Sequence, residues 1–128
     1  MSYYFSKTLD MPFEEAITSV TEQLKTEGFG VLTEIDVKAT LKKKLGEDFG
    51  NYRILGACNP PFAYRALLAE DKIGTMLPCN IIVHETATGA VEVAAVDPVA
   101  SMQAIENPAL SNIAAQVQKK LKRVIDSL

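Results

Sequence analysis

The chain has 128 residues, 48% of them hydrophobic and 23% charged, with a formal net charge of −3 and a pI near 5.1. This length and composition predict one globular domain, residues 1–128, with a core of its own. The acidic balance works against binding to a phosphate backbone, so we expect no nucleic-acid partner.

The first residues, MSYYFSKTLDM, lack the basic segment and apolar core of a secretion signal, and no apolar stretch has the length of a bilayer span. We therefore expect a cytoplasmic protein with no membrane partner. In that compartment its two cysteines are expected to be reduced thiols, because cytosolic reductants keep thiols reduced.

The first part of the chain predicts a strand, a helix and a second strand. Residues 3–9 have the composition of a strand, and Asp10 is expected to cap a helix that holds Pro12 in its first turn. Gly28 is placed to end this helix in the left-handed conformation. Residues 29–35 alternate between apolar and polar types, which predicts the second strand.

A second helix is predicted between Asp36, as its N-cap, and Gly46, as its left-handed end. Its apolar positions lie at helical spacing and are Val37, Leu41 and Leu45.

Residues 52–57 predict a third strand. Asn59 then precedes two prolines, and a residue before proline favours the extended conformation of an N-cap, so Asn59 is expected to cap a helix that runs to about Glu70.

The remaining chain predicts a hairpin and two more helices. Residues 80–86 and 91–97 are β-rich runs joined by the short, glycine-containing connection ATGA. Asp97 begins a short helix, and Asn107 precedes a long amphipathic one. Apolar residues recur along the long helix at Leu110, Ile113, Val117, Leu121, Val124 and Leu128.

This order of elements predicts an α+β fold. An antiparallel hairpin and an alternating strand do not suit a parallel sheet buried on both faces, so we expect a two-layer sandwich with helices on one face of the sheet.

The segment ILGACNPPFAYRALLAEDKIGTMLPCNIIVHE, residues 54–85, resembles the central signature of the domain of unknown function 302 family. The matching positions are Gly56, Cys58, Asn59, Pro60, Gly74, Leu77, Pro78, Cys79, Asn80 and Glu85. The VDP at residues 96–98 and the amphipathic C-terminus also look like this family. The resemblance implies a mostly antiparallel, curved sheet with a fold similar to the TATA-box-binding-protein-like topology. It also implies a homodimer, and it implies no specific activity or cofactor.

Two Cys-Asn pairs, at Cys58-Asn59 and Cys79-Asn80, raise the question of a shared site. Cys58 ends one predicted strand and Cys79 begins another, so antiparallel strands would bring them to one end of the sheet, whereas parallel strands would separate them by roughly 17 to 20 Å. The antiparallel sheet implied by the resemblance favours one cluster. The candidate binding residues are Cys58, Asn59, Gly74, Leu77, Cys79 and Asn80.

Two readings of this cluster stay open. A helix N-terminus stabilises thiolate and anions, so a lowered cysteine pKa would indicate a thiol or ligand site. Alternatively, buried cysteines and Asn-Pro segments can serve packing and helix initiation alone. A structural zinc site needs four ligands, and the chain offers two cysteines and one histidine. The histidine, His84, is predicted on the face of its strand opposite to Cys79. We therefore expect no metal.

Three functions are consistent with these patterns. The first is a domain that binds a small molecule or an anion beside the two Cys-Asn pairs. The second is a thiol-dependent redox enzyme with Cys79 as attacker and Cys58 as resolving thiol. The third is a dimeric structural or interaction domain that associates through a sheet edge or the hairpin.

Overall fold

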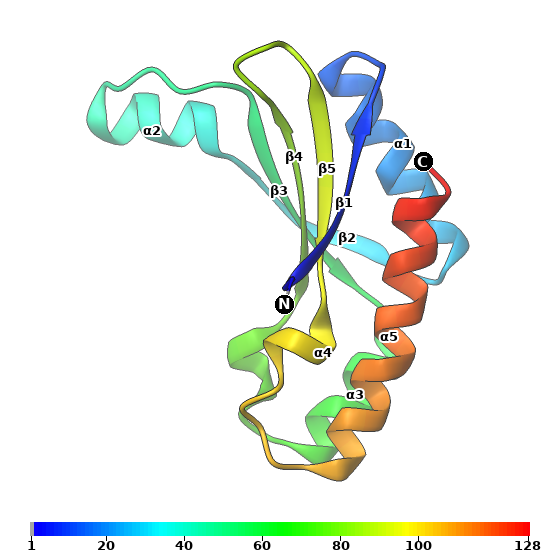
Figure 1. Cartoon of the computed structure of the whole chain (residues 1–128). Coiled ribbons are helices and arrows are strands. Elements are labelled where there is room, and N and C mark those ends of the chain that lie inside the picture. The colour runs from blue at the N-terminus through cyan, green and yellow to red at the C-terminus, as the bar shows by residue number, and fades with distance from the viewer. Residues whose placement is uncertain (1) are drawn as a thin grey trace.

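Five antiparallel strands form one open sheet in the computed structural model, which describes residues 2–128 (Figure 1). The strands are β1 (Tyr4–Leu9), β2 (Gly30–Asp36), β3 (Tyr52–Cys58), β4 (Cys79–Glu85) and β5 (Val91–Val96). Their order across the sheet is β1-β5-β4-β3-β2. The predicted hairpin of β4 and β5 therefore lies inside the sheet, and β1 and β2 form its edges.

Helices cover one face of this sheet and leave the other uncovered (Figure 1). The helices of the chain are α1 (Phe13–Thr26), α2 (Val37–Leu45), α3 (Pro60–Ala69), a short 3₁₀ helix η1 (Ile73–Met76), α4 (Pro98–Ser101) and α5 (Pro108–Asp126). Helices α1 and α5 pack on the sheet, α3 lies beside α5, and α2 extends away from the body. This confirms the predicted two-layer α+β fold. None of the helices within residues 2–128 is long and apolar enough to cross a membrane.

The main core lies between the sheet and helices α1 and α5. Alternate residues of each central strand, such as Ile81 and Val83 of β4, point toward the helices and are fully buried. Leu24 of α1 and Leu121 of α5 pack against them with 0% exposure. A second, smaller cluster forms at one end of the molecule around Ala66, Ile73 and Leu110.

Several predicted helix ends are confirmed by their backbone geometry. The Asp36 carboxylate accepts a 3.0 Å hydrogen bond from the Ala39 amide, and Gly46 ends α2 at a φ of 69°. Asp97 and Asn107 likewise accept amide hydrogen bonds at the starts of α4 and α5.

Two local predictions are wrong. Pro12, not Asp10, is the N-cap of α1: its backbone is extended, and its carbonyl accepts the first helical bond, from Ala16 N at 3.0 Å. The alternation of β2 is also interrupted, because the register with β3 shifts between Val31 and Thr33. Val31 therefore packs against the core while Ile35, beyond the bulge, is 47% exposed on the uncovered face.

Candidate functional site

The two Cys-Asn pairs meet at one end of the sheet. Cys58 is the last residue of β3 and Cys79 the first of β4, and the antiparallel register pairs Cys79 with Ala57. The predicted antiparallel arrangement of the two segments is therefore the observed one.

Strand alternation nevertheless separates the two thiols onto different faces. Cys79 shares a face with its partner Ala57 and packs against the core, whereas Cys58, one residue further along β3, belongs to the opposite face. Both cysteines are free and half-buried. Because the two strands end here, space at the end of the sheet is accessible from both side chains.

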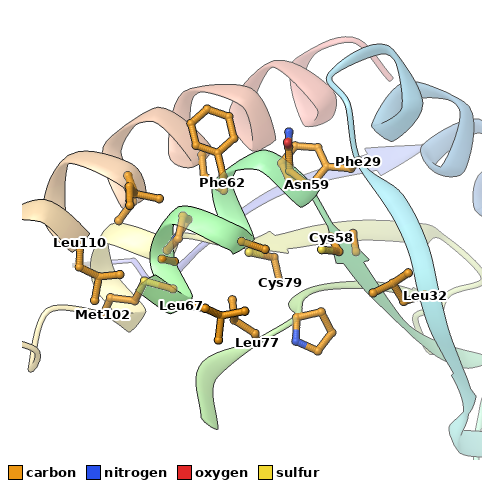
Figure 2. A pocket seen from close by; sticks show the side chains of 18 residues that line it. Phe29, Leu32, Cys58, Asn59, Phe62, Leu67, Leu77, Cys79, Met102 and Leu110 are labelled. Carbon is orange, nitrogen blue, oxygen red and sulfur yellow. The ribbon is translucent and has the colours of Figure 1, made fainter. Parts of the chain in front are cut away.

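That space is a cavity of about 290 Å³ between α3, α5 and the ends of β3 and β4 (Figure 2). Residues of both the main core and the smaller cluster around Ile73 line it. Its lining is Phe29, Leu32, Ala57, Cys58, Asn59, Phe62, Ala63, Ala66, Leu67, Leu77, Pro78, Cys79, Pro98, Met102, Leu110, Ile113, Ala114 and Val117. The cavity opens to solvent beside Leu32 and Leu67, whose side chains are 69% and 47% exposed.

Four of the six candidate residues line this cavity: Cys58, Asn59, Leu77 and Cys79. Two do not. Asn80 follows Cys79 on β4 and is turned by the strand to the uncovered face, where it is exposed. Gly74 lies exposed in the short helix η1.

Asn59 occupies the predicted N-cap position of α3, but its side chain does not cap the helix. Its Nδ2 instead donates a 3.0 Å hydrogen bond to the carbonyl oxygen of Glu27, in the turn between α1 and β2. Asn59 is the one buried polar residue among those described, at 8% exposure. The prediction of a side-chain cap is therefore wrong, because a tertiary contact uses the amide.

The lack of a side chain at Gly56 allows the segment before Cys79 to lie close to the sheet. A Cβ at Gly56 would come within 2.2 Å of Thr33 Oγ1 and 2.7 Å of Pro78 Cγ. The Pro78 ring, which follows a cis peptide bond, therefore packs directly over the Gly56 backbone. This contact holds the Leu77-Pro78 segment against the end of β3 and shapes one wall of the cavity.

Burial determines the ionisation of the Cys79 thiol. Burial, reinforced by the nearby Cys58 thiol, raises the pKa of Cys79 to about 11 from an ordinary value of 9.0. The Cys79 thiol is therefore protonated at neutral pH. The lowered pKa that would indicate an attacking thiolate is therefore not found at this residue.

Within residues 2–128, no cluster of three or more His, Cys, Asp and Glu side chains could hold a metal ion. His84 lies on the uncovered face, where its Nε2 is 2.8 Å from Glu92 Oε1. It is thus an ordinary partner in a cross-strand pair and does not approach the cavity.

Helix α5 supplies the part of the site that the sequence did not indicate. Leu110, Ile113, Ala114 and Val117 form one wall of the cavity. Their helical spacing predicted a buried stripe, but a stripe does not reveal whether it packs tightly or faces a void.

Comparison with known proteins agrees with this geometry. The family model described as domain of unknown function DUF302 matches residues 5–128. No curated protein matches the chain. Among solved structures, the crystal structure of an uncharacterized conserved protein DUF302 from Bacillus stearothermophilus has 32% sequence identity and a TM-score of 0.91, with 98% of each chain covered. The chain therefore belongs to the DUF302 family of domains of unknown function.

Proposed function

We propose that this protein is a cytoplasmic small-ligand-binding domain whose site is the cavity at the end of β3 and β4. The observation that carries the proposal is the cavity itself, which both cysteines border. Protein interiors are packed to the density of organic crystals, and the atoms around a void lose contacts on one side. A ligand restores those contacts, so a void lined by Phe62, Leu110 and Val117 favours occupation.

The thiol-enzyme alternative has less support. A nucleophilic cysteine acts as the thiolate, and burial keeps the Cys79 thiol protonated. His84, the natural candidate for a general base, is engaged by Glu92 on the uncovered face.

Cavity size limits the ligand and its affinity. At roughly 30 Å³ per water-sized group, a cavity of about 290 Å³ holds about ten non-hydrogen atoms. Ligands gain roughly 0.3 kcal/mol per non-hydrogen atom in ordinary cases, and roughly 1.5 kcal/mol per atom is the ceiling for the best small ones. Ten atoms therefore contribute between about 3 and 15 kcal/mol, and for an ordinary ligand in the lower half of this range we expect dissociation constants from about 10 mM down to micromolar.

Nuclear magnetic resonance is suited to this affinity range. A set of neutral, anionic and cationic fragments of about ten non-hydrogen atoms would be titrated into the isotope-labelled protein. We expect at least one to shift the resonances of Cys58, Leu77, Ala114 and their neighbours in the cavity. The proposal fails if no fragment shifts them.

Two substitutions to leucine provide the matched control. Ala63 lines the cavity, so Ala63→Leu should fill it and abolish binding. Ala39 lies exposed on α2, so Ala39→Leu should leave binding unchanged. If Ala63→Leu fails to fold, Ala114→Val narrows the same cavity by a smaller change.

A specific observation also favours the homodimer. On the uncovered face, Ile35, Ile54, Ile82 and Ala94 are successive register partners, so they form one apolar row across four strands. A sheet face in water is ordinarily polar, and interface cores are poor in charge. The ionisable residues nearby, His84 and Glu92, are hydrogen-bonded to each other.

Helix α2 adds to this surface. All nine of its residues keep some exposure, Leu45 is 68% exposed, and Phe49 beyond it is 48% exposed. A nine-residue helix is marginal without tertiary packing. We propose that a second copy covers the uncovered face together with α2, in place of the association through a sheet edge or the hairpin that the sequence favoured.

A further inference from the structure

We infer that the cavity selects an uncharged, predominantly apolar ligand and rejects anions of the same shape. This inference rests on the proposed function and deepens it, because the sequence left an anion equally open. It follows from the polar groups that the cavity can offer to a ligand.

The N-terminus of α3 lacks the amides that an anion site needs. A helix binds anions through the free N–H groups of its first turn. Here the first two helical residues are Pro60 and Pro61, which have no N–H, and the Ala63 amide already donates to Asn59 O at 2.9 Å. Phe62 alone is left with an amide to offer in this turn.

The polar side chains of the lining are equally poor anion ligands. Asn59 Nδ2 donates one of its two N–H groups to Glu27 O, so the side chain keeps one uncharged N–H and its amide oxygen, an acceptor that repels an anion. The two thiols are weak donors, and neither adds positive charge. Across the described residues 2–128, no charged side chain lines the cavity. An ionised ligand would therefore lose its hydration without compensation.

Two cationic side chains, Arg65 and Lys120, lie near the cavity, but both contact the ring of Phe62. The Arg65 guanidinium carbon is 4.6 Å from the centroid of the Phe62 ring, and Lys120 Nζ is 5.9 Å from it. Lys120 also lies 3.8 Å from Glu27 Oε1. Neither residue belongs to the lining. Because Lys120 lies beside Glu27, Arg65 is the residue that would bind an anion if this inference were wrong.

Matched pairs of compact probes test the inference. Methyl benzoate and benzoate share a ring and differ in charge, and benzyl alcohol and benzylamine differ by a neutral and a cationic head group. We expect each neutral member to bind with a dissociation constant about tenfold or more below that of its charged counterpart, because the charged group has no partner in the lining.

The outcomes separate this inference from the proposed function. If benzoate binds as tightly as methyl benzoate, and Arg65→Gln abolishes that binding, the ligand is an anion held at Phe62 and this inference is overturned while the binding function stands. If benzoate binds equally well without Arg65, the inference is also overturned. If no probe of either kind shifts the cavity resonances, the binding function itself fails.

Discussion

Asn59 Nδ2 donates a 3.0 Å hydrogen bond to the carbonyl oxygen of Glu27, a residue 32 positions earlier in the chain. The bond ties the start of α3 to the turn that follows α1. Gly28, at a φ of 87°, lies against the same amide: a Cβ there would be 3.2 Å from Nδ2. The Cys-Asn-Pro segment therefore joins two parts of the fold, whereas a capping residue would act within one helix.

Substitution of Asn59 distinguishes these two roles. Asn59→Ala should lower the free energy of unfolding by about 1 to 3 kcal/mol, because the Glu27 carbonyl loses its buried donor. Asn59→Asp keeps the ability to cap a helix but cannot donate to Glu27, so it should be at least as destabilising. Chemical denaturation measures both. Recovery of stability in the aspartate variant would indicate a capping role after all.

A methyl group at Gly56 should be costly. Gly56→Ala places a Cβ against Thr33 Oγ1 and the Pro78 ring, and the resulting overpacking should lower stability by about 1 to 3 kcal/mol. Gly30 is the matched control in β2, because a Cβ there meets nothing within 4 Å. Gly30→Ala should change stability by less than about 0.5 kcal/mol. Similar losses for the two variants would mean that Pro78 does not rest on Gly56.

Alkylation of Cys79 should be slow until strongly alkaline pH. In a Cys58→Ser variant, Cys79 is the remaining thiol, and burial, the larger cause of its raised pKa, is retained. A pKa near 11 in place of 9.0 leaves about a hundredfold less thiolate at neutral pH. Iodoacetamide rates should rise until about pH 11. A rate plateau at or below pH 9.0 would show an ordinary or activated thiol.

The same pKa predicts how stability changes with pH. The unfolded chain ionises Cys79 near 9.0 and the folded chain near 11, so the unfolded state releases this proton first. The contribution of Cys79 to stability is therefore complete below pH 9.0 and decreases as pH rises toward 11. Cys79→Ser should lack this part of the alkaline decrease in denaturation midpoint. An identical decrease in both proteins would contradict it.

Sedimentation velocity tests the proposed homodimer and its surface. The unmodified protein should sediment as a dimer at micromolar concentration, and Ile82→Glu, in the apolar row, should produce a monomer because a charge would be buried without a partner. Leu68→Glu is the control, since Leu68 is 70% exposed on α3 and outside that row. A monomeric unmodified protein, or equal dissociation by both variants, would remove this proposal.

The sequence by itself determined the elements and the fold class. Helix ends at Asp36, Gly46 and Asn107 depend on local backbone geometry and on side chains a few residues away, so local patterns were sufficient to predict them. The same holds for the hairpin of β4 and β5. The resemblance of residues 54–85 to a known family supported an antiparallel sheet, and that sheet brought Cys58 and Cys79 to one end.

Only the tertiary structure decided what that end of the sheet contains. The Asn59 side chain had a local and a distant hydrogen-bond partner available. It binds the distant carbonyl of Glu27, because a buried polar group without a hydrogen bond is costly. The bulge in β2 moved Ile35 to the uncovered face. The cavity lies where α5 contacts both clusters: Val117 of its lining belongs to the main core and Leu110 to the smaller cluster. Periodicity shows which residues of a helix are buried, whereas this void depends on how side chains from six elements, β2, β3, β4, α3, α4 and α5, meet in space.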